Sequence, residues 1–129
     1  MGAGNSAGQA ALFFSKHARS VTVLCRGSTV AKSMSRYLIA QLEARANIRI
    51  LVDSEVIAAH GDESLEEVDV RNRISKETTR LASGGLYIFI GADAQTDWLP
   101  PEIALDEQGY VLTGSEMRAA GRWSDARDP

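Results

Sequence analysis

The first seven residues place the strongest constraint on what this chain can fold into. Gly2-Ala3-Gly4-Asn5-Ser6-Ala7 fits the G-x-G-x-x-G/A pattern of a turn that leads from a strand into a helix. The first glycine permits the tight turn, the second lets a pyrophosphate approach the backbone, and the small last residue lets the helix pack on the sheet. The helix N-terminus then offers free N–H groups to phosphates. The motif predicts a dinucleotide site formed by Gly2, Ala3, Gly4, Asn5, Ser6 and Ala7.

Short motifs of this kind also occur in glycine-rich turns and flexible chain ends that bind nothing. The residues that follow favour the dinucleotide interpretation. Residues 5–18 carry apolar side chains at helical spacing, and residues 20–26 form a short β-branched run typical of a buried strand. A helix followed directly by a strand is the order that a dinucleotide turn requires.

Arg26 lies at the position that selects the nucleotide in such sites. The strand over 20–26 ends about 20 residues after the motif, where an acidic residue normally holds the ribose 2′-hydroxyl of NAD. This position carries Arg26 instead, and a guanidinium can hold a 2′-phosphate through bidentate hydrogen bonds. We therefore expect NADP(H) as the cofactor, with Lys32 and Arg36 adding positive charge. The alternative is that all three are solvated surface residues.

The order of the predicted elements indicates an α/β fold. A second helix is expected over residues 29–46 and a second strand over 48–52. This alternation implies right-handed crossovers and a parallel sheet. Short segments separated by polar turns then predict a three-stranded antiparallel meander over residues 55–60, 65–73 and 78–81. The whole is expected to be a Rossmann-like three-layer domain.

One strand of such a sheet has no counterpart in the sequence. Residues 86–90 form an apolar run that predicts a buried strand, and a short strand is also expected over 110–112. In a doubly wound sheet the strand before the glycine motif is central, but only Met1 precedes Gly2. We therefore expect the first central strand to be missing from the chain, which leaves unpaired backbone groups on its neighbours. Either the remaining strands close up, a partner chain fills the gap, or the domain is weakly stable.

Composition argues against several other kinds of site. The net charge of −3 does not provide the basic face that nucleic acid requires, and no apolar run is long enough to cross a membrane. Cys25 is the only cysteine, so the chain holds no internal disulfide or CxxC pair, and with two histidines no metal site is expected. Cys25 is expected to be a core residue. The N-terminal residues lack a signal-peptide pattern, so a cytoplasmic location is expected.

Several segments together carry a family resemblance. GAGNSAGQAALFFSKHARSVTVLCRG, LYIFIGADAQTDWL and IALDEQGYVLTG resemble the pyridine-nucleotide-binding domain of thioredoxin reductases and related flavoproteins. The resemblance implies an NAD(P)-binding domain over 1–114 and a tail over 115–129 that leads towards an FAD domain outside the chain. It also implies that Gly91 binds cofactor. Gly27 replaces a second arginine that is common in the family, and Ala94 replaces a proline.

The function that the resemblance implies is transfer of a hydride from NADPH to FAD. This chain would bind NADPH, contain no catalytic residue and show no turnover alone, while FAD would be bound only in a full-length parent that commonly forms homodimers. Two alternatives are a stand-alone nucleotide-binding module and an inactive truncated remnant.

Overall fold

The computed structural model describes residues 1–121 of the chain in two compact units. The first unit comprises Met1–Ile90 and the second begins at Gly91. Residues 122–129 of the predicted tail, including Trp123, lie outside the described part. Each unit is described by itself below, and the division into a nucleotide-binding domain over 1–114 and a tail stays a prediction.

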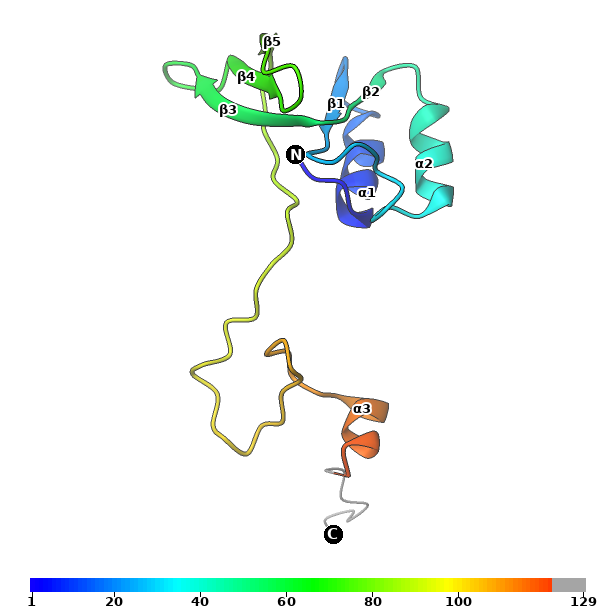
Figure 1. Cartoon of the computed structure of the whole chain (residues 1–129), viewed down its shortest axis with the longest axis vertical. Helices are drawn as coiled ribbons and strands as arrows, with labels where there is room; N and C mark the ends of the chain where they lie inside the picture. The colour runs from blue at the N-terminus through cyan, green and yellow to red at the C-terminus, as the bar shows by residue number, and fades with distance from the viewer. Residues whose placement is uncertain (122–129) are drawn as a thin grey trace. The chain divides into compact units, whose positions relative to one another are not determined.

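The first half of the first unit alternates helices and strands, as predicted (Figure 1). Its elements are α1 (Asn5–Phe14), β1 (Val21–Leu24), α2 (Arg36–Glu43) and β2 (Ile48–Leu51). Strands β1 and β2 pair in parallel, with Val21 opposite Ile48 and Leu24 opposite Leu51. The parallel sheet expected from the sequence is therefore confirmed.

Both helices are shorter than predicted. The helix expected over 29–46 begins at Arg36, because Ser35 has an extended backbone and its hydroxyl oxygen accepts a hydrogen bond from the Leu38 N–H at 3.4 Å. This side-chain cap defines a helix start that apolar spacing alone could not locate. The first helix ends at Phe14 rather than at residue 18, and the Ser15 hydroxyl donates to the Leu12 carbonyl at 2.8 Å where it stops.

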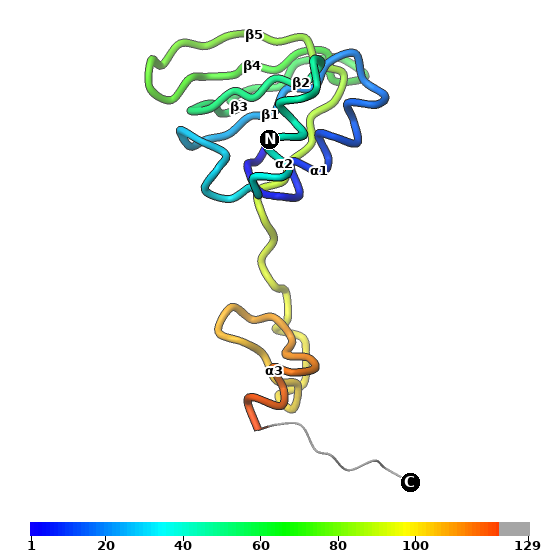
Figure 2. The backbone as a smooth tube through the Cα atoms, turned by 90° about the vertical axis from the view of Figure 1, so that its right-hand side faces the viewer, coloured from blue at the N-terminus to red at the C-terminus, as the bar shows by residue number. Residues whose placement is uncertain are grey.

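The second half of the unit is the predicted three-stranded antiparallel meander (Figure 2). It consists of β3 (Ser54–His60), β4 (Glu67–Asn72) and β5 (Thr78–Ala82), in the order β3-β4-β5. The β3–β4 register shifts between Val56 and Ala58. The combination of a parallel and an antiparallel sheet in one α/β unit is confirmed.

Successive residues of β1 belong to different cores, because side chains alternate between the faces of a strand. Val23 packs in a cluster with residues from α1 and α2, whereas Leu24 packs in a cluster with Val68 and Val70 of β4. In Figure 1 the two helices lie on one side of β1 and β2, and the meander lies on the other. Cys25 is 2% exposed in the helix-side cluster, as expected for a core residue.

The buried strand predicted over 86–90 is wrong. These residues form no named strand, and the side chains of Tyr87, Ile88 and Ile90 are 52%, 58% and 62% exposed. The backbone of this segment is hydrogen-bonded to Met1, since the Phe89 N–H donates to the Met1 carbonyl at 2.7 Å. The apolar sequence predicted a buried strand, but the segment belongs to neither sheet of the described chain, so its side chains are not held between two layers.

The sheet has not closed up beside β1. A cavity of about 840 Å³ remains there, bordered by α1, β1, the meander and residues 81–89. We call it the β1 cavity. Of the alternatives expected from the sequence, closing of the remaining strands is therefore wrong.

The second unit contains little regular structure among residues 91–121. The strand expected over 110–112 is reduced to one isolated bridge between Leu105 and Val111. Two side chains brace the loop: the Tyr110 hydroxyl donates to the Ala92 carbonyl and the Thr96 hydroxyl donates to the Gly109 carbonyl, both at 2.7 Å. Helix α3 (Gly114–Ala119) follows.

A charged cluster centred on Asp69 links the three strands of the meander. Its carboxylate accepts hydrogen bonds from the Arg80 Nε at 2.7 Å and Nη2 at 3.0 Å, and lies 2.7 Å from the His60 Nε2. The bonds from Arg80 first, and from His60 second, hold the pKa of Asp69 well below its usual range. The ionised form is thus favoured in the folded state.

We predict that Asp69→Asn lowers the thermal midpoint at neutral pH. Because the pKa of Asp69 is lower in the folded state, its ionised carboxylate stabilises the fold at every pH above the unfolded-state pKa of about 3.9. This stabilisation is lost as the pH falls from about 3.9 towards the folded-state pKa. The gap between Asp69→Asn and the unsubstituted chain should therefore shrink below about pH 4. Circular-dichroism melts from pH 7 to pH 2 measure this, with the exposed Asp62→Asn as control. A gap that is the same at every pH would contradict the prediction.

Candidate nucleotide-binding site

Gly2 is required by the fold itself. Its φ of 139° is rarely adopted by other residues, and a Cβ added there would lie 2.2 Å from the Phe89 carbonyl oxygen. Its N–H donates to the Leu24 carbonyl at 3.0 Å. The absence of a side chain at Gly2 thus lets the backbone turn closely between the end of β1 and Phe89, as the motif predicted.

Gly4 has a different environment. It is the N-cap of α1 with an ordinary φ of −84°, and the nearest heavy atom to an added Cβ is the Ser33 carbonyl oxygen at 3.9 Å. The first hydrogen bond of the helix is from Gly8 N–H to the Gly4 carbonyl at 3.2 Å, and no side chain caps the helix start. The preceding N–H groups therefore have no partner within the helix. An added Cβ at Gly4 would make only an ordinary van der Waals contact with Ser33.

Side chains fix the glycine turn against the segment before α2. The Asn5 Oδ1 accepts from the Ser35 N–H at 2.8 Å, and the Ser33 hydroxyl donates to the Ala3 carbonyl at 2.9 Å. Through these bonds, Asn5 and Ala3 stabilise the turn. Both residues were predicted to bind the cofactor, and the structure shows that they also have this structural role.

Close packing of α1 depends on a residue that the motif does not mark. Ala7 is buried at the predicted position, but the closest approach is at Gly8, where an added Cβ would lie 3.0 Å from the Met34 Sδ. Gly8 follows the motif directly, but nothing in the motif marks its contact with Met34, which is distant in the sequence. Ser6 is exposed in the first turn of α1.

Arg26 follows β1 on an exposed loop. The Arg73 Nη1 donates to the Arg26 carbonyl at 2.8 Å, and the Asp53 N–H donates to the Gly27 carbonyl at 2.9 Å. The Arg73 N–H in turn donates to the Asp53 carbonyl at 2.6 Å. Sequence reasoning missed Arg73, because no pattern links it to a loop 47 residues earlier. The end of β4 thus supports the loop that carries Arg26.

Lys32 is exposed in the turn that contacts the glycine motif, and Arg36 is exposed at the start of α2, which follows that turn. The glycine turn, the Arg26 loop and this turn therefore meet at the carboxyl end of β1, which is the edge where open α/β sheets bind ligands. Gly91 has a φ of 96° and belongs to the second unit, so its cofactor role stays a prediction. Within residues 1–121, no group of His, Cys, Asp or Glu side chains could hold a metal ion.

Comparison with known proteins assigns the class. The chain matches the pyridine nucleotide-disulphide oxidoreductase family over residues 1–122, and it belongs to that family. Within the family it is thioredoxin-reductase-like. It is 30% identical to a thioredoxin reductase of Chlamydia trachomatis over 113 residues, and 30% identical over 117 residues to a "34.2 kDa protein in rubredoxin operon" of Clostridium pasteurianum. These alignments cover 88% and 91% of this chain. The resemblance stated from the sequence is confirmed at the level of the family.

Solved structures agree with the fold. The thioredoxin reductase of Lactococcus lactis superposes with a TM-score of 0.75 at 26% identity over 90% of this chain, and that of T. acidophilum with a TM-score of 0.74 at 26% identity over 88%. The chain spans about a third of the length of the proteins it matches, for example 36% of the Chlamydia trachomatis protein and 38% of the Lactococcus lactis chain. No helix described within residues 1–121 has the length and hydrophobicity to cross a membrane.

We predict that alanine destabilises the chain much more at Gly2 than at Gly4. Gly2→Ala should destabilise the chain by more than about 2 kcal/mol, because the added methyl group overlaps the backbone at Phe89 and the φ is strained. Gly4→Ala should cost no more than about 1 kcal/mol, because its φ suits alanine and the added methyl group makes only an ordinary contact, at 3.9 Å from the Ser33 carbonyl oxygen. Urea titrations followed by circular dichroism measure both changes. Equal losses for the two variants would contradict this account of the turn.

Proposed function

We propose that this chain binds NADPH as the nucleotide-binding part of a thioredoxin-reductase-like flavoprotein that passes hydride from NADPH to FAD. The proposed architecture is a Rossmann-like three-layer domain, in which helices and meander cover opposite faces of the parallel strands. The observation that carries the proposal is the uncapped N-terminus of α1 behind Gly4.

The α1 terminus fits a pyrophosphate in both shape and charge. The N–H groups that precede the first helical bond are free donors, and the helix dipole adds partial positive charge there. Gly4 presents no side chain, so phosphate oxygens can approach its backbone closely. The bonds from Ser33 and Ser35 hold this turn in place before any ligand arrives, which lowers the entropic loss on binding.

Arg26 is proposed to select NADPH over NADH. Its guanidinium is exposed beyond β1 at the same edge as the glycine turn, and Arg73 supports its backbone. A 2′-phosphate gives a guanidinium a bidentate partner that NADH lacks. Lys32 and Arg36 add positive charge on the neighbouring turn and helix. Arg73 acts as a positioning residue in this proposal.

The chemistry of the reaction would come from the cofactors, with NADPH supplying the hydride and FAD accepting it. Residues of this chain would bind and orient the nucleotide, with Gly91 as a further cofactor contact, and none is proposed as catalytic. The same proposal includes an FAD domain in a longer parent, to which the tail over 115–129 leads, a homodimeric parent and a cytoplasmic location.

Two substitutions should weaken nucleotide binding in different ways. Arg26→Ala should reduce NADPH affinity about tenfold and leave NADH affinity unchanged, because it removes one charge-assisted contact to the 2′-phosphate. Gly4→Ala should weaken both nucleotides, because its methyl group occupies space that the pyrophosphate needs. Titrations of the full chain, followed by nucleotide fluorescence, measure these affinities.

Arg45→Ala is the matched control, since Arg45 is an exposed arginine after the far end of α2. It should bind both nucleotides like the unsubstituted chain. Equal affinity of the unsubstituted chain for NADPH and NADH would refute the role of Arg26. If neither nucleotide binds, the chain is better described as an inactive remnant. A stand-alone module is excluded if fusion to an FAD domain yields NADPH-dependent reduction of an artificial acceptor.

A further inference from the structure

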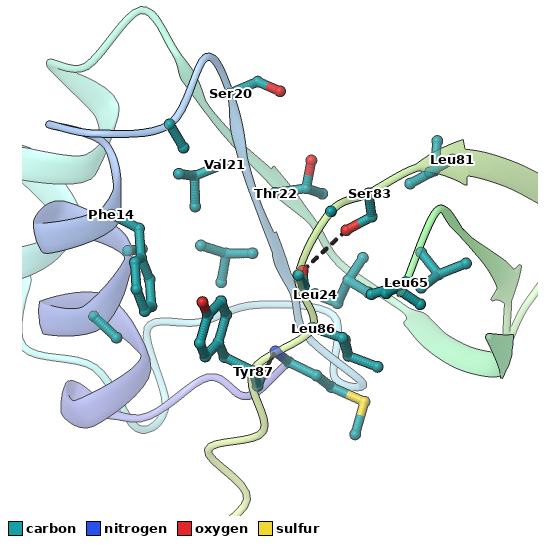
Figure 3. Close-up of a pocket in the computed structure, with 18 of the residues that line it drawn as sticks. Phe14, Ser20, Val21, Thr22, Leu24, Leu65, Leu81, Ser83, Leu86 and Tyr87 are labelled. Atoms are coloured by element: carbon teal, nitrogen blue, oxygen red, sulfur yellow. Dashed lines mark hydrogen bonds between the residues drawn. The ribbon is translucent and has the colours of Figure 1, made fainter. Parts of the chain in front are cut away.

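Arg73 contacts the loop after β1 from the other sheet of the first unit. Figure 3 shows Ser20 at the start of β1 and Leu24 towards its other end, and the loop that carries Arg26 lies beyond Leu24. Arg73 follows β4, and its Nη1 donates to the Arg26 carbonyl at 2.8 Å. The guanidinium of Arg73 therefore lies against the backbone of the residue that is proposed to select NADPH.

The positive charge around this loop exceeds the negative charge. Arg26 forms no ion pair within residues 1–121, and Asp53 pairs with neither arginine. Glu55 is the carboxylate next to Arg73, with its Oε2 3.9 Å from the Arg73 Nε. The Glu55 Oε1 accepts from the Arg71 Nη2 at 2.7 Å and from the Arg71 Nε at 3.2 Å, and these bonds lower the pKa of Glu55. Glu55 thus pairs mainly with Arg71, which leaves excess positive charge at Arg26 and Arg73.

The loop itself offers further hydrogen-bond donors. The N–H groups of Gly27 and Ser28 have no partner among residues 1–121, and neither has the exposed Ser28 hydroxyl. The far end of the loop is fixed at Thr29. Its carbonyl accepts from the Cys25 Sγ at 3.6 Å, and its Oγ1 accepts from the Ala31 N–H at 3.0 Å. Free N–H groups in a fixed loop suit an oxyanion, and a neighbouring guanidinium adds the opposite charge.

We infer that Arg73 itself binds the 2′-phosphate of NADPH, as a second guanidinium beside that of Arg26. This inference rests on the proposed function and adds a specificity-determining residue to it. The Nη2 of Arg73 has no partner within residues 1–121, and half of the side chain is exposed. The oxygens of one phosphate group can accept from two guanidinium groups at once. NADH has an uncharged hydroxyl at this position, so Arg73 should strengthen the binding of NADPH alone.

The alternative role of Arg73 is only to hold the backbone of Arg26. The two roles differ in how substitutions of the two arginines combine. A residue that acts only through Arg26 loses its effect on affinity once Arg26→Ala has removed that side chain. A direct contact with the phosphate remains in the Arg26→Ala variant.

A double-mutant cycle on the full chain separates the two roles, with NADPH and NADH affinities measured by nucleotide fluorescence. Arg73→Gln should weaken NADPH binding about fivefold in the unsubstituted chain and again in the Arg26→Ala variant, with NADH binding unchanged. Arg73→Lys retains the charge and should weaken NADPH binding less than Arg73→Gln does. Lys76→Gln is the matched control, because it removes one exposed charge from the same β4–β5 turn and should leave both affinities unchanged.

The outcomes distinguish this inference from the proposed function. If Arg73→Gln has no effect in the Arg26→Ala variant while the unsubstituted chain prefers NADPH, the inference is overturned and the proposed function stands. Equal losses for Arg73→Lys and Arg73→Gln would also overturn it, because charge would then not be the cause. Weaker NADH binding in Arg73→Gln would overturn it in favour of a structural role. Binding of neither nucleotide by the unsubstituted chain would overturn both the inference and the proposed function.

Discussion

The backbone hydrogen bonds of Met1 and Gly2 are the contacts on which the first unit depends. They join the end of β1 to residues 87–89, which pair with no named strand in the described part of the chain. The same bonds set the position of the glycine turn, since Gly2 passes the Phe89 carbonyl with no room for a side chain. Helix α1 begins three residues later, at Asn5. The backbone of residues 1–2 therefore fixes both the pairing beside β1 and the position of the glycine turn.

The two sides of β1 contribute differently to the unit. Its helix side is packed by residues that the sequence marks with regular apolar spacing, such as Leu38 and Leu42. Its other face packs on the meander through Leu24, Val68 and Val70. The edge next to the cavity has apolar neighbours but little backbone pairing. The unit thus has two packed core clusters but few backbone partners beside residues 86–90, three of which stay largely exposed.

Much of the fold followed from local patterns. Helix–strand alternation identified the parallel pair, and short alternating segments identified the meander, because both depend on side-chain periodicity within one element. The start of α2 was misplaced because Ser35 ends the apolar turn with a cap. The motif predicted the glycine turn, whereas Gly8 against Met34 and Arg73 against the Arg26 loop are contacts between distant segments. Such contacts leave no periodic signal in the sequence.

The bond from Arg73 to the Arg26 carbonyl ties two parts of the unit that belong to different sheets. Arg73 lies directly after β4, so its direction is set by how β4 pairs with β3 and β5. A slip of β4 by a single residue would turn its side chains to the opposite face. The loop beyond β1 would then lose its support without any change in its own sequence. The loop after β1 therefore depends on strand pairing in a sheet to which β1 does not belong.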